Sequence, residues 1–247
     1  MIAAALATTG LLGWGAFAWW RDRNVGPVQR GWRVAEAHGC FNCHGPGGRT
    51  GQEDPGEGIG GVPTFTKDDL EGYAKDEQEI REWILDGVPQ RLRVPAEDAT
   101  EASLIRMPAF RGVLTEAELD DLVAYVKAVG DLETPADARA EEGRQAAERL
   151  GCFGCHGPQG RGSPSNPRSL KGYIPSWDGR DFPELARDDA EVIEWILDGR
   201  PRRLQDDPVA RRFLDRQVVQ MPAYRGRIAP DDVDRIVHYI RWLRVSR

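Results

Sequence analysis

The sequence predicts an all-α protein in which an apolar N-terminal segment is followed by two similar domains in tandem. Three observations support this prediction. The chain of 247 residues repeats itself once, helix start and stop signals recur in both halves, and no sustained apolar–polar alternation indicates a strand. The formal net charge of -7 argues against a nucleic-acid partner, so we expect none.

The first element is the apolar segment 2–20, which carries no charged residue. As a helix it would be about 28 Å long, close to the roughly 30 Å of hydrocarbon in a bilayer. Trp19 and Trp20 suit a membrane interface. We predict a transmembrane anchor over 1–23, with residues 2–20 in the lipid bilayer. A cleaved signal peptide ending at the small-x-small site AFA is the alternative.

The rest of the chain repeats its motifs once, at a nearly constant offset. CFNCHGPGG at Cys40 returns as CFGCHGPQG at Cys152, and WILDG occurs in both halves. MPAFRG at Met107 returns as MPAYRG at Met221. A period this long is typical of two copies of one small domain, because solenoid units are much shorter.

We place the first domain at 24–130 and the second at 131–247, joined by the polar stretch GDLETPADA. LEGY at Leu70 matches LKGY at Leu170, but these two copies lie closer together along the chain than the two copies of each other motif. This match predicts an insertion in each copy, GQEDPGEGIGGVP in the first and IPSWDGRDFPEL in the second. Insertions are tolerated in surface loops, so both stretches are expected to be loops.

Capping signals indicate where the helices begin and end. Asp76 with Glu79, and Thr115 with Glu118, have the spacing of capping boxes, and Gly87 is expected to end the first of these helices. The residues before each Cys motif, GWRVAEAHG and GRQAAERLG, also have a helical pattern. Short helices joined by glycine- and proline-rich loops provide little apolar core. Another group therefore has to fill the centre of each domain.

The Cys-x-x-Cys-His motif is the attachment signature of c-type heme. One helical turn between the cysteines directs both sulfurs toward the vinyl groups of one porphyrin edge, and the next histidine reaches the iron. A zinc site needs closer Cys pairs and no histidine fixed behind each one. A thioredoxin-type redox pair needs a βαβ setting. We predict two covalently attached heme c groups on the residues of the two motifs: Cys40, Cys43, His44, Cys152, Cys155 and His156.

Methionine is predicted to supply the sixth iron ligand. Apart from Met1, the only methionines are Met107 and Met221, which follow the two motif histidines at nearly equal separations along the chain. A lone methionine is often a flexible core filler, but two at matched positions in the best-preserved repeat favour ligation. His/Met ligation is the cytochrome c pattern. The predicted iron ligands are His44, Met107, His156 and Met221.

On these motifs both halves resemble class I c-type cytochromes, over residues 28 to 247. The resemblance implies a glycine of the first helix packed against an aromatic of the last, and Gly31 with Tyr125 and Gly143 with Tyr239 match those positions. The whole chain is similar to membrane-anchored diheme cytochromes of respiratory complexes, such as the diheme subunit of cbb-type oxidases. It differs from the compact members in its longer span from histidine to methionine.

The resemblance implies an electron carrier or electron-transfer subunit, with no catalysis of its own. We expect a relay from a quinol-oxidising or dehydrogenase donor to an oxidase or soluble cytochrome acceptor. The partner would be a respiratory or photosynthetic membrane complex, with a soluble cytochrome or copper protein as a further partner. Covalent heme attachment takes place outside the cytoplasm, so we expect a single-pass protein of the bacterial inner membrane with periplasmic heme domains.

Some features conflict with this interpretation or have no role in it. The arginines after residue 20 would place the C-terminal side in the cytoplasm by the positive-inside rule. A diheme peroxidase is the alternative function, and it needs one heme with a displaceable ligand.

Arg91 and Arg203 recur after WILDG, either on a solvated face or beside a heme propionate. The basic stretch RPRRLQDDPVARRFLDR has no assigned role.

Overall fold

A computed structural model describes residues 24–53, 61–93 and 105–245. These residues form α-helices and short 3-10 turns, with two isolated β-bridges and no sheet. The predicted all-α class is therefore confirmed. The predicted anchor over 1–23 lies outside the described residues. None of the helices among the described residues combines the length and hydropathy that crossing a bilayer requires.

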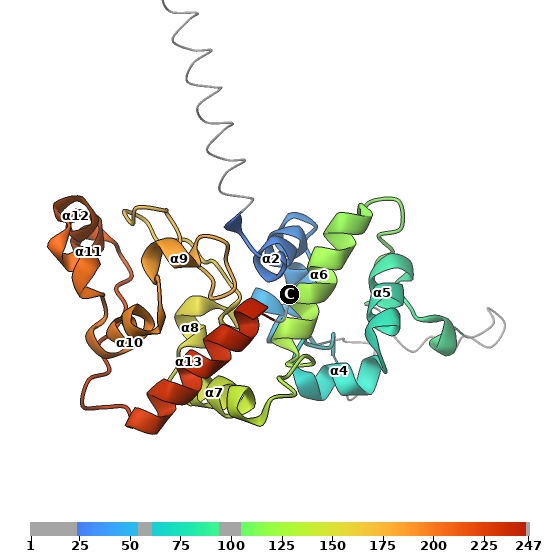
Figure 1. The fold of residues 1–247 in the computed structure, drawn as a ribbon. Helices are drawn as coiled ribbons and strands as arrows, with labels where there is room; N and C mark the ends of the chain where they lie inside the picture. The colour runs from blue at the N-terminus through green and yellow to red at the C-terminus, as the bar shows by residue number, and fades with distance from the viewer. Residues whose placement is uncertain (1–23, 54–60, 94–104, 246–247) are drawn as a thin grey trace, which may run out of the picture. The chain divides into compact units, whose positions relative to one another are not determined.

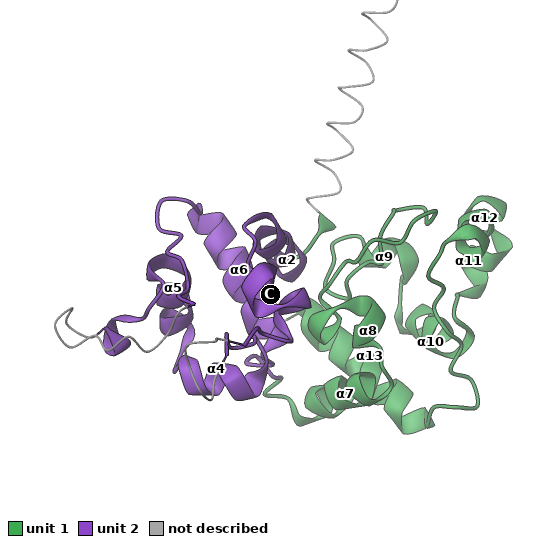
Figure 2. Ribbon diagram, turned by 180° about the vertical axis from the view of Figure 1, so that it is seen from behind, with its two compact units in different colours: residues 1–26, 135–247 green, residues 27–134 purple. Residues whose placement is uncertain are grey.

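The described chain forms two compact units, which Figure 2 shows in different colours. In chain order, we call residues 27–134, purple in Figure 2, the first unit, and residues 135–245 together with 24–26, green in Figure 2, the second unit. The helices of the first unit are α2 (Pro27–Ala37), α3 (Phe41–His44), α4 (Lys67–Tyr73), α5 (Glu77–Asp86) and α6 (Glu116–Val129). Those of the second unit are α7 (Ala138–Arg149), α8 (Phe153–His156), α9 (Phe182–Leu185), α10 (Asp189–Asp198), α11 (Arg202–Asp206), α12 (Pro208–Arg216) and α13 (Pro230–Val245).

In each unit the first helix packs against the last, α2 on α6 and α7 on α13 (Figure 1). A glycine allows the two helices to approach closely. A Cβ atom at Gly31 would lie 1.9 Å from the Asp121 carbonyl oxygen, and one at Gly143 would lie 2.0 Å from that of Arg235. The side chains of Tyr125 and Tyr239 border these same crossings. The predicted glycine–aromatic pairs are therefore in contact.

We expect Gly31→Ala and Gly143→Ala each to lower the free energy of unfolding by about 1–3 kcal/mol, because the added methyl overpacks a helix crossing. Gly72→Ala is the matched control. No atom lies within 4 Å of a Cβ at Gly72, within α4, so this change should be neutral or stabilise by about 0.5–1 kcal/mol. Urea unfolding followed by circular dichroism measures all three. Equal stability of the Gly31 and Gly72 variants would contradict the packing argument.

Helix caps agree with the sequence, with one difference. Thr115 and Glu118 form the predicted capping box of α6, and Gly87 ends α5 with φ +74°. The side chain of Asp76 accepts a hydrogen bond from the backbone N–H of Glu79, but the Glu79 carboxylate accepts from the backbone N–H of Lys75. The predicted capping box of α5 is therefore a simple N-cap, because Glu79 reaches one residue further back.

The predicted alignment of LEGY with LKGY is wrong. The indole N–H of Trp83 donates to the Tyr73 carbonyl at 3.0 Å, and that of Trp195 donates to the Leu185 carbonyl at 2.9 Å. Leu185 is thus the counterpart of Tyr73, at the same offset that relates the two Cys motifs. The short match at Tyr173 is a coincidence, and the register runs from the Cys motif to WILDG without an insertion.

The two predicted loops are affected in different ways. Residues 174–185 are not a surface loop: they contain α9 and bury Trp177 and Asp181, which are 5% and 1% exposed. Asp181 accepts a hydrogen bond from the Tyr173 hydroxyl at 2.6 Å, so Tyr173 is fixed inside the second unit. In the first copy, the described ends of the predicted loop are non-helical, and residues 54–60 lie outside the described part of the chain.

Candidate functional site

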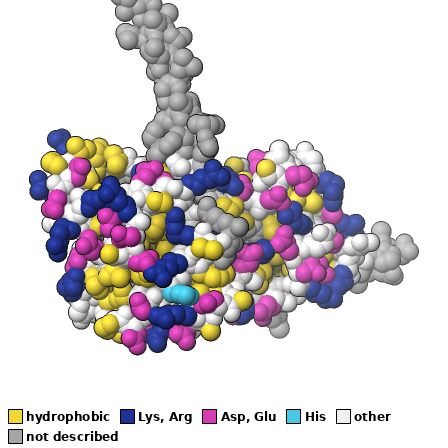
Figure 3. Space-filling model, viewed as in Figure 1, with side chains coloured by type: hydrophobic (Ala, Val, Ile, Leu, Met, Phe, Trp, Pro, Cys, Tyr) yellow, Lys and Arg dark blue, Asp and Glu magenta, His cyan; other side chains and the backbone are white. Residues whose placement is uncertain are grey.

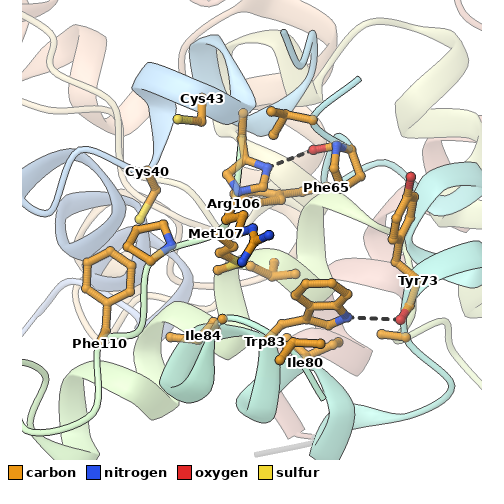
Figure 4. A pocket seen from close by; sticks show the side chains of 18 of the residues that line it. Cys40, Cys43, Phe65, Tyr73, Ile80, Trp83, Ile84, Arg106, Met107 and Phe110 are labelled. Carbon is orange, nitrogen blue, oxygen red and sulfur yellow. Dashed lines mark hydrogen bonds between the residues drawn. The ribbon is translucent and has the colours of Figure 1, made fainter. Parts of the chain in front are cut away.

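The first unit contains a partly open cavity of about 1090 Å³ that brings together all four of its predicted site residues. The cavity is lined by Cys40, Cys43, His44 and Met107, and most of the remaining wall is apolar or aromatic. Figure 4 shows the two cysteines at one end of the cavity and Trp83 at the other, with Met107 between them. The predicted residues of the first domain therefore share one site.

The second unit repeats this arrangement in a cavity of about 410 Å³. Its wall includes the four residues predicted for this domain: Cys152, Cys155, His156 and Met221. Helix α12 forms part of the wall. The stretch of the first unit that corresponds to α12 falls largely within 94–104, outside the described residues, so the two volumes are not directly comparable.

Each Cys-x-x-Cys-His motif forms a single helical turn. The backbone N–H of His44 donates to the Cys40 carbonyl at 3.0 Å, and that of His156 donates to the Cys152 carbonyl at 3.0 Å. Residues three apart on a helix lie on one face, so both thiols of a motif can face one edge of a flat ligand. None of the four cysteines is in a disulfide, so all four sulfurs are available for thioether bonds. The predicted geometry of the motif is present in both units.

The two histidines have an environment suited to binding iron through Nε2. In the first unit Nδ1 of His44 lies 2.7 Å from the Pro63 carbonyl oxygen, an acceptor that fixes the proton on Nδ1. Burial lowers the pKa of His44, and it lowers the pKa of His156 to about 4, so both rings are neutral near pH 7. Nδ1 of His156 is buried without a hydrogen bond of normal geometry, beside the matching Pro175 carbonyl.

An aromatic ring packs beside each histidine. The rings of His44 and Phe65 are 4.6 Å apart between centroids, and those of His156 and Trp177 are 5.1 Å apart. Both aromatic rings also contact the tyrosine of the last helix. Packing against these rings restricts the orientation of each imidazole. Neither aromatic was singled out from the sequence, because the wrong register hid that Phe65 and Trp177 occupy equivalent positions in the two copies.

The methionine segment is fastened to the WILDG helix in the same way in both units. The Arg111 guanidinium contacts the Asp86 carboxylate at 2.7 Å, and Arg225 contacts Asp198 at 2.7 Å. In each unit the aromatic residue before the arginine also bonds to this helix through its backbone. The N–H of Phe110 donates to the Ile84 carbonyl, and the N–H of Tyr224 donates to the Ile196 carbonyl. These contacts explain why WILDG and MPA(F/Y)RG recur together. Asp86 and Asp198 are positioning residues that sequence reasoning missed, although both belong to the repeated motif.

A left-handed glycine ends each WILDG helix and makes room for the methionine backbone. Gly87 and Gly199 both have φ +74°. A Cβ at Gly87 would lie 2.4 Å from the Met107 carbonyl oxygen, and one at Gly199 would lie 2.5 Å from that of Met221. A side chain at either position would therefore push the methionine segment away from the helix. The glycine serves both the helix end and the placement of the predicted ligand.

Arg91 and Arg203 are held in ion pairs and do not line the cavities. Arg91 pairs with Glu79 at 2.7 Å and Arg203 pairs with Glu191 at 2.6 Å, and neither arginine lines its cavity. The Arg203 guanidinium lowers the pKa of the Glu191 carboxyl to about 2. These are ion pairs on the helix surface, which agrees with the solvated-face interpretation. The structure gives no support for contact with a heme propionate.

The arrangement fits a covalently attached heme in each unit. Two thiols on one helical turn, a neutral imidazole beside them and a thioether on the opposing segment line one largely apolar cavity. This donor set is the one that holds iron in cytochromes c. It does not resemble a zinc site, which would need further cysteine or histidine ligands, and no cluster of three or more metal-binding side chains occurs among the described residues.

Residues 26–126 match the family described as cytochrome C oxidase, cbb3-type, subunit III, and residues 140–244 match the family described as cytochrome c. Each matched range contains the two cysteines, the histidine and the methionine that line one of the two cavities. The chain therefore belongs to the c-type cytochromes, with one cytochrome c domain in each half. Its cofactors are two covalently bound heme c groups.

The chain is similar to two curated oxidase subunits. It is 23% identical over 212 residues to the cbb3-type cytochrome c oxidase subunit FixP of Azorhizobium caulinodans, covering 85% of this chain and 58% of that protein. It is 27% identical over 141 residues to cytochrome c oxidase subunit 2 of Alkalihalophilus pseudofirmus, covering 53% of this chain and 34% of that protein. The chain thus spans less than two thirds of either relative.

Among solved structures, the chain is similar to the reducing HAO-like protein complex of Kuenenia stuttgartiensis at 18% identity. The similarity covers 90% of this chain and 97% of that chain, with a TM-score of 0.27. A score this low carries no argument about fold or function.

Proposed function

We propose that the chain transfers single electrons through two His/Met-ligated heme c groups. The observation that carries the proposal is the repeated composition of the two cavities, each with the thiols, imidazole and thioether of one domain. The bound heme supplies one-electron Fe(III)/Fe(II) chemistry. The residues assigned to the two hemes are Cys40, Cys43, His44 and Met107 in the first domain, and Cys152, Cys155, His156 and Met221 in the second.

Each group of protein residues has a separate task in this proposal. The cysteines would hold the heme by thioether bonds, and the histidine would bind its iron. The methionine would supply the second protein ligand, on a segment held by the ion pair of Asp86 with Arg111 or of Asp198 with Arg225. An iron bound by both residues would have no position open to a small substrate. The site can then exchange electrons with little change in geometry.

We further propose that the chain relays electrons at a bacterial membrane, between a respiratory donor and an oxidase or soluble acceptor. The names of its relatives support a role in a respiratory oxidase complex. The anchor over residues 2–20 and the periplasmic position of the heme domains are parts of this proposal that rest on the sequence and on the chemistry of heme attachment. Co-purification in mild detergent would separate a fixed subunit from a free carrier.

Rapid mixing tests the assigned function against the peroxidase alternative. The reduced protein should pass one electron per heme to ferricyanide within the mixing experiment, and the as-isolated protein should not turn over hydrogen peroxide. The physical reason is that an iron bound by both histidine and methionine would have no position open to peroxide. Stopped-flow absorbance measures both reactions. Sustained peroxide turnover, or a heme that ferricyanide cannot oxidise, would overturn the proposal.

A further inference from the structure

The end of the second unit that carries α11 and α12 differs in charge from the rest of the chain. The chain has a formal net charge of -7, yet residues 200–216 contain six arginines and three aspartates. Figure 3 shows basic and hydrophobic side chains together at the end where Figure 1 places these two helices. The structure shows which of these charges are neutralised.

Few of the arginines in this segment are neutralised by a carboxylate. Arg200 pairs with Asp215 at 2.6 Å, and Arg203 pairs with Glu191. Asp207 caps α12, where it accepts hydrogen bonds from two backbone N–H groups at 2.8 and 2.9 Å. Four arginines of the segment make no ion pair with any described residue: Arg202, Arg211, Arg212 and Arg216. Against the exposed carboxylates of Asp206 and Asp207, these four arginines leave a formal excess of two positive charges around α12.

Helix α12 connects this surface to the heme cavity. Ala210, Phe213 and Leu214 line the cavity of the second unit, so one face of the helix belongs to its wall. Arg212 and Arg216, four residues apart, are exposed on the helix, as is Arg211. The outer side of a single helix layer over the cavity therefore carries three of the four unpaired arginines, Arg211, Arg212 and Arg216. A protein seated on this face would lie within one helix diameter, about 10 Å, of the cavity.

A small apolar group lies next to these arginines. Leu170, Val209 and Val218 are 60%, 64% and 63% exposed, and Leu170 also lines the cavity. The backbone N–H of Val218 donates to the Pro167 carbonyl at 3.1 Å. The Asn166 side chain bonds to both the backbone N–H and the backbone C=O of Val219, at 2.9 Å each. The loop and the chain after α12 are thereby fixed. We call Leu170, Val209, Arg211, Arg212, Arg216 and Val218 the α12 surface.

We propose that the α12 surface is the docking site of an acidic electron-transfer protein, which exchanges electrons with the heme of the second domain. The proposal rests on the proposed function. Unpaired arginines would steer a partner whose carboxylates surround a small apolar patch, and such charge complementarity raises association rates more than affinity. A small apolar centre with a charged rim suits the brief encounters typical of redox partners. One electron passes between the two proteins, with no proton or covalent bond transferred.

Two other occupants fit the surface less well. A helix that lies in a membrane interface buries Trp, Phe or Leu side chains on its apolar face. The only aromatic residue of α12 is Phe213, and it faces the cavity. The exposed apolar group contains two valines and one leucine, which provide little area to insert. A second copy of the chain is also disfavoured, because two chains that each carry a net charge of -7 repel one another at low salt.

The test uses the full-length diheme protein and plastocyanin, a small copper protein with an acidic face. The reduced diheme protein is mixed with Cu(II) plastocyanin in a stopped-flow instrument. One electron from the diheme protein reduces the copper of plastocyanin to Cu(I). We expect Arg211→Gln/Arg212→Gln to slow the bimolecular rate at low salt by roughly five- to tenfold, because two steering charges are lost. At 0.5 M salt the effect should shrink to less than about twofold, since the charges are screened.

Arg139→Gln/Arg241→Gln is the matched control. It removes the same formal charge from the same unit, but these arginines pair with Asp234 and Asp189 away from α12. We expect its rate to differ from the wild-type rate by less than about twofold.

Equal rates for the two double variants would overturn the proposal. Two other results for Arg211→Gln/Arg212→Gln would also overturn it, if the plastocyanin rate were unchanged. Loss of binding to anionic phosphatidylglycerol vesicles would assign the surface to a membrane, and loss of self-association in sedimentation velocity would assign it to a second copy of the chain. Failure of the wild-type protein to reduce ferricyanide would instead refute the proposed function. Retained ferricyanide reduction without a contrast between the variants would refute only the docking site.

Discussion

Cys152→Ala/Cys155→Ala is expected to halve the covalently bound heme and to unfold the second domain while the first domain keeps its heme. Without thioether bonds the ligand is no longer fixed at the cavity edge. A cavity of about 410 Å³ without its ligand corresponds to a loss of up to about 10 kcal/mol, at roughly 24 cal/mol per Å³. This upper bound equals the whole stability of many domains, which is about 5–15 kcal/mol.

The pyridine hemochrome assay measures the heme content, and mass spectrometry of tryptic fragments shows which motif carries it. Cys40→Ala/Cys43→Ala is the reciprocal variant and should lose only the first heme. Limited proteolysis should then cut the domain that lost its heme and spare the other. Two hemes per chain in either variant would contradict the assignment. Proteolysis of both domains would mean that the two units do not fold independently.

The sequence could predict the fold class, and it could single out residues that line one cavity in each unit, because these signals are local. A helical turn needs only the residues between Cys40 and His44, and the capping box of Thr115 with Glu118 lies within one turn of helix. The methionines were found because they are rare and recur at matched positions. Such signals depend on spacing along the chain, so they need no knowledge of which segments meet in space.

The residues that the sequence did not reveal act through contacts between distant segments. Pro63 and Phe65 reach His44 from a separate loop. Pro175 matches Pro63, but Trp177 stands in place of Phe65 and the residues around them differ, which hid the repeat. The false match at Tyr173 then shifted the alignment. In space, the indole hydrogen bonds of the two WILDG helices give the correct register at once.

Charge balance was beyond sequence reasoning for a related reason. The basic stretch of the second domain contains three aspartates, which suggested neutralisation. In the structure Asp207 caps a helix and Asp215 pairs with Arg200. Counting charges along the chain does not show where the unpaired charges lie, because the count does not reveal which arginines and carboxylates pair with one another.

Met107→His is expected to leave both hemes attached and to lower the reduction potential of the first heme. A thioether stabilises the reduced iron relative to a second imidazole, and axial ligands together span roughly 0.8 V. We expect a decrease on the order of 0.1 V or more within that range. Potentiometric titration followed by absorbance measures it. The second heme, with Met221 unchanged, is the internal control and should keep its potential.

Met107→Leu separates a ligand from a core filler. Leucine conserves the volume of methionine and usually costs less than about 1.5 kcal/mol in a core, so a filler would tolerate the change without a spectral effect. If Met107 binds the iron, the leucine variant loses the near-infrared sulfur-to-iron band of the first heme and becomes high-spin. Met221→Leu should do the same for the second heme. An unchanged band and potential in both leucine variants would show that the thioethers only pack against the heme, and the closed coordination on which the carrier function depends would be absent.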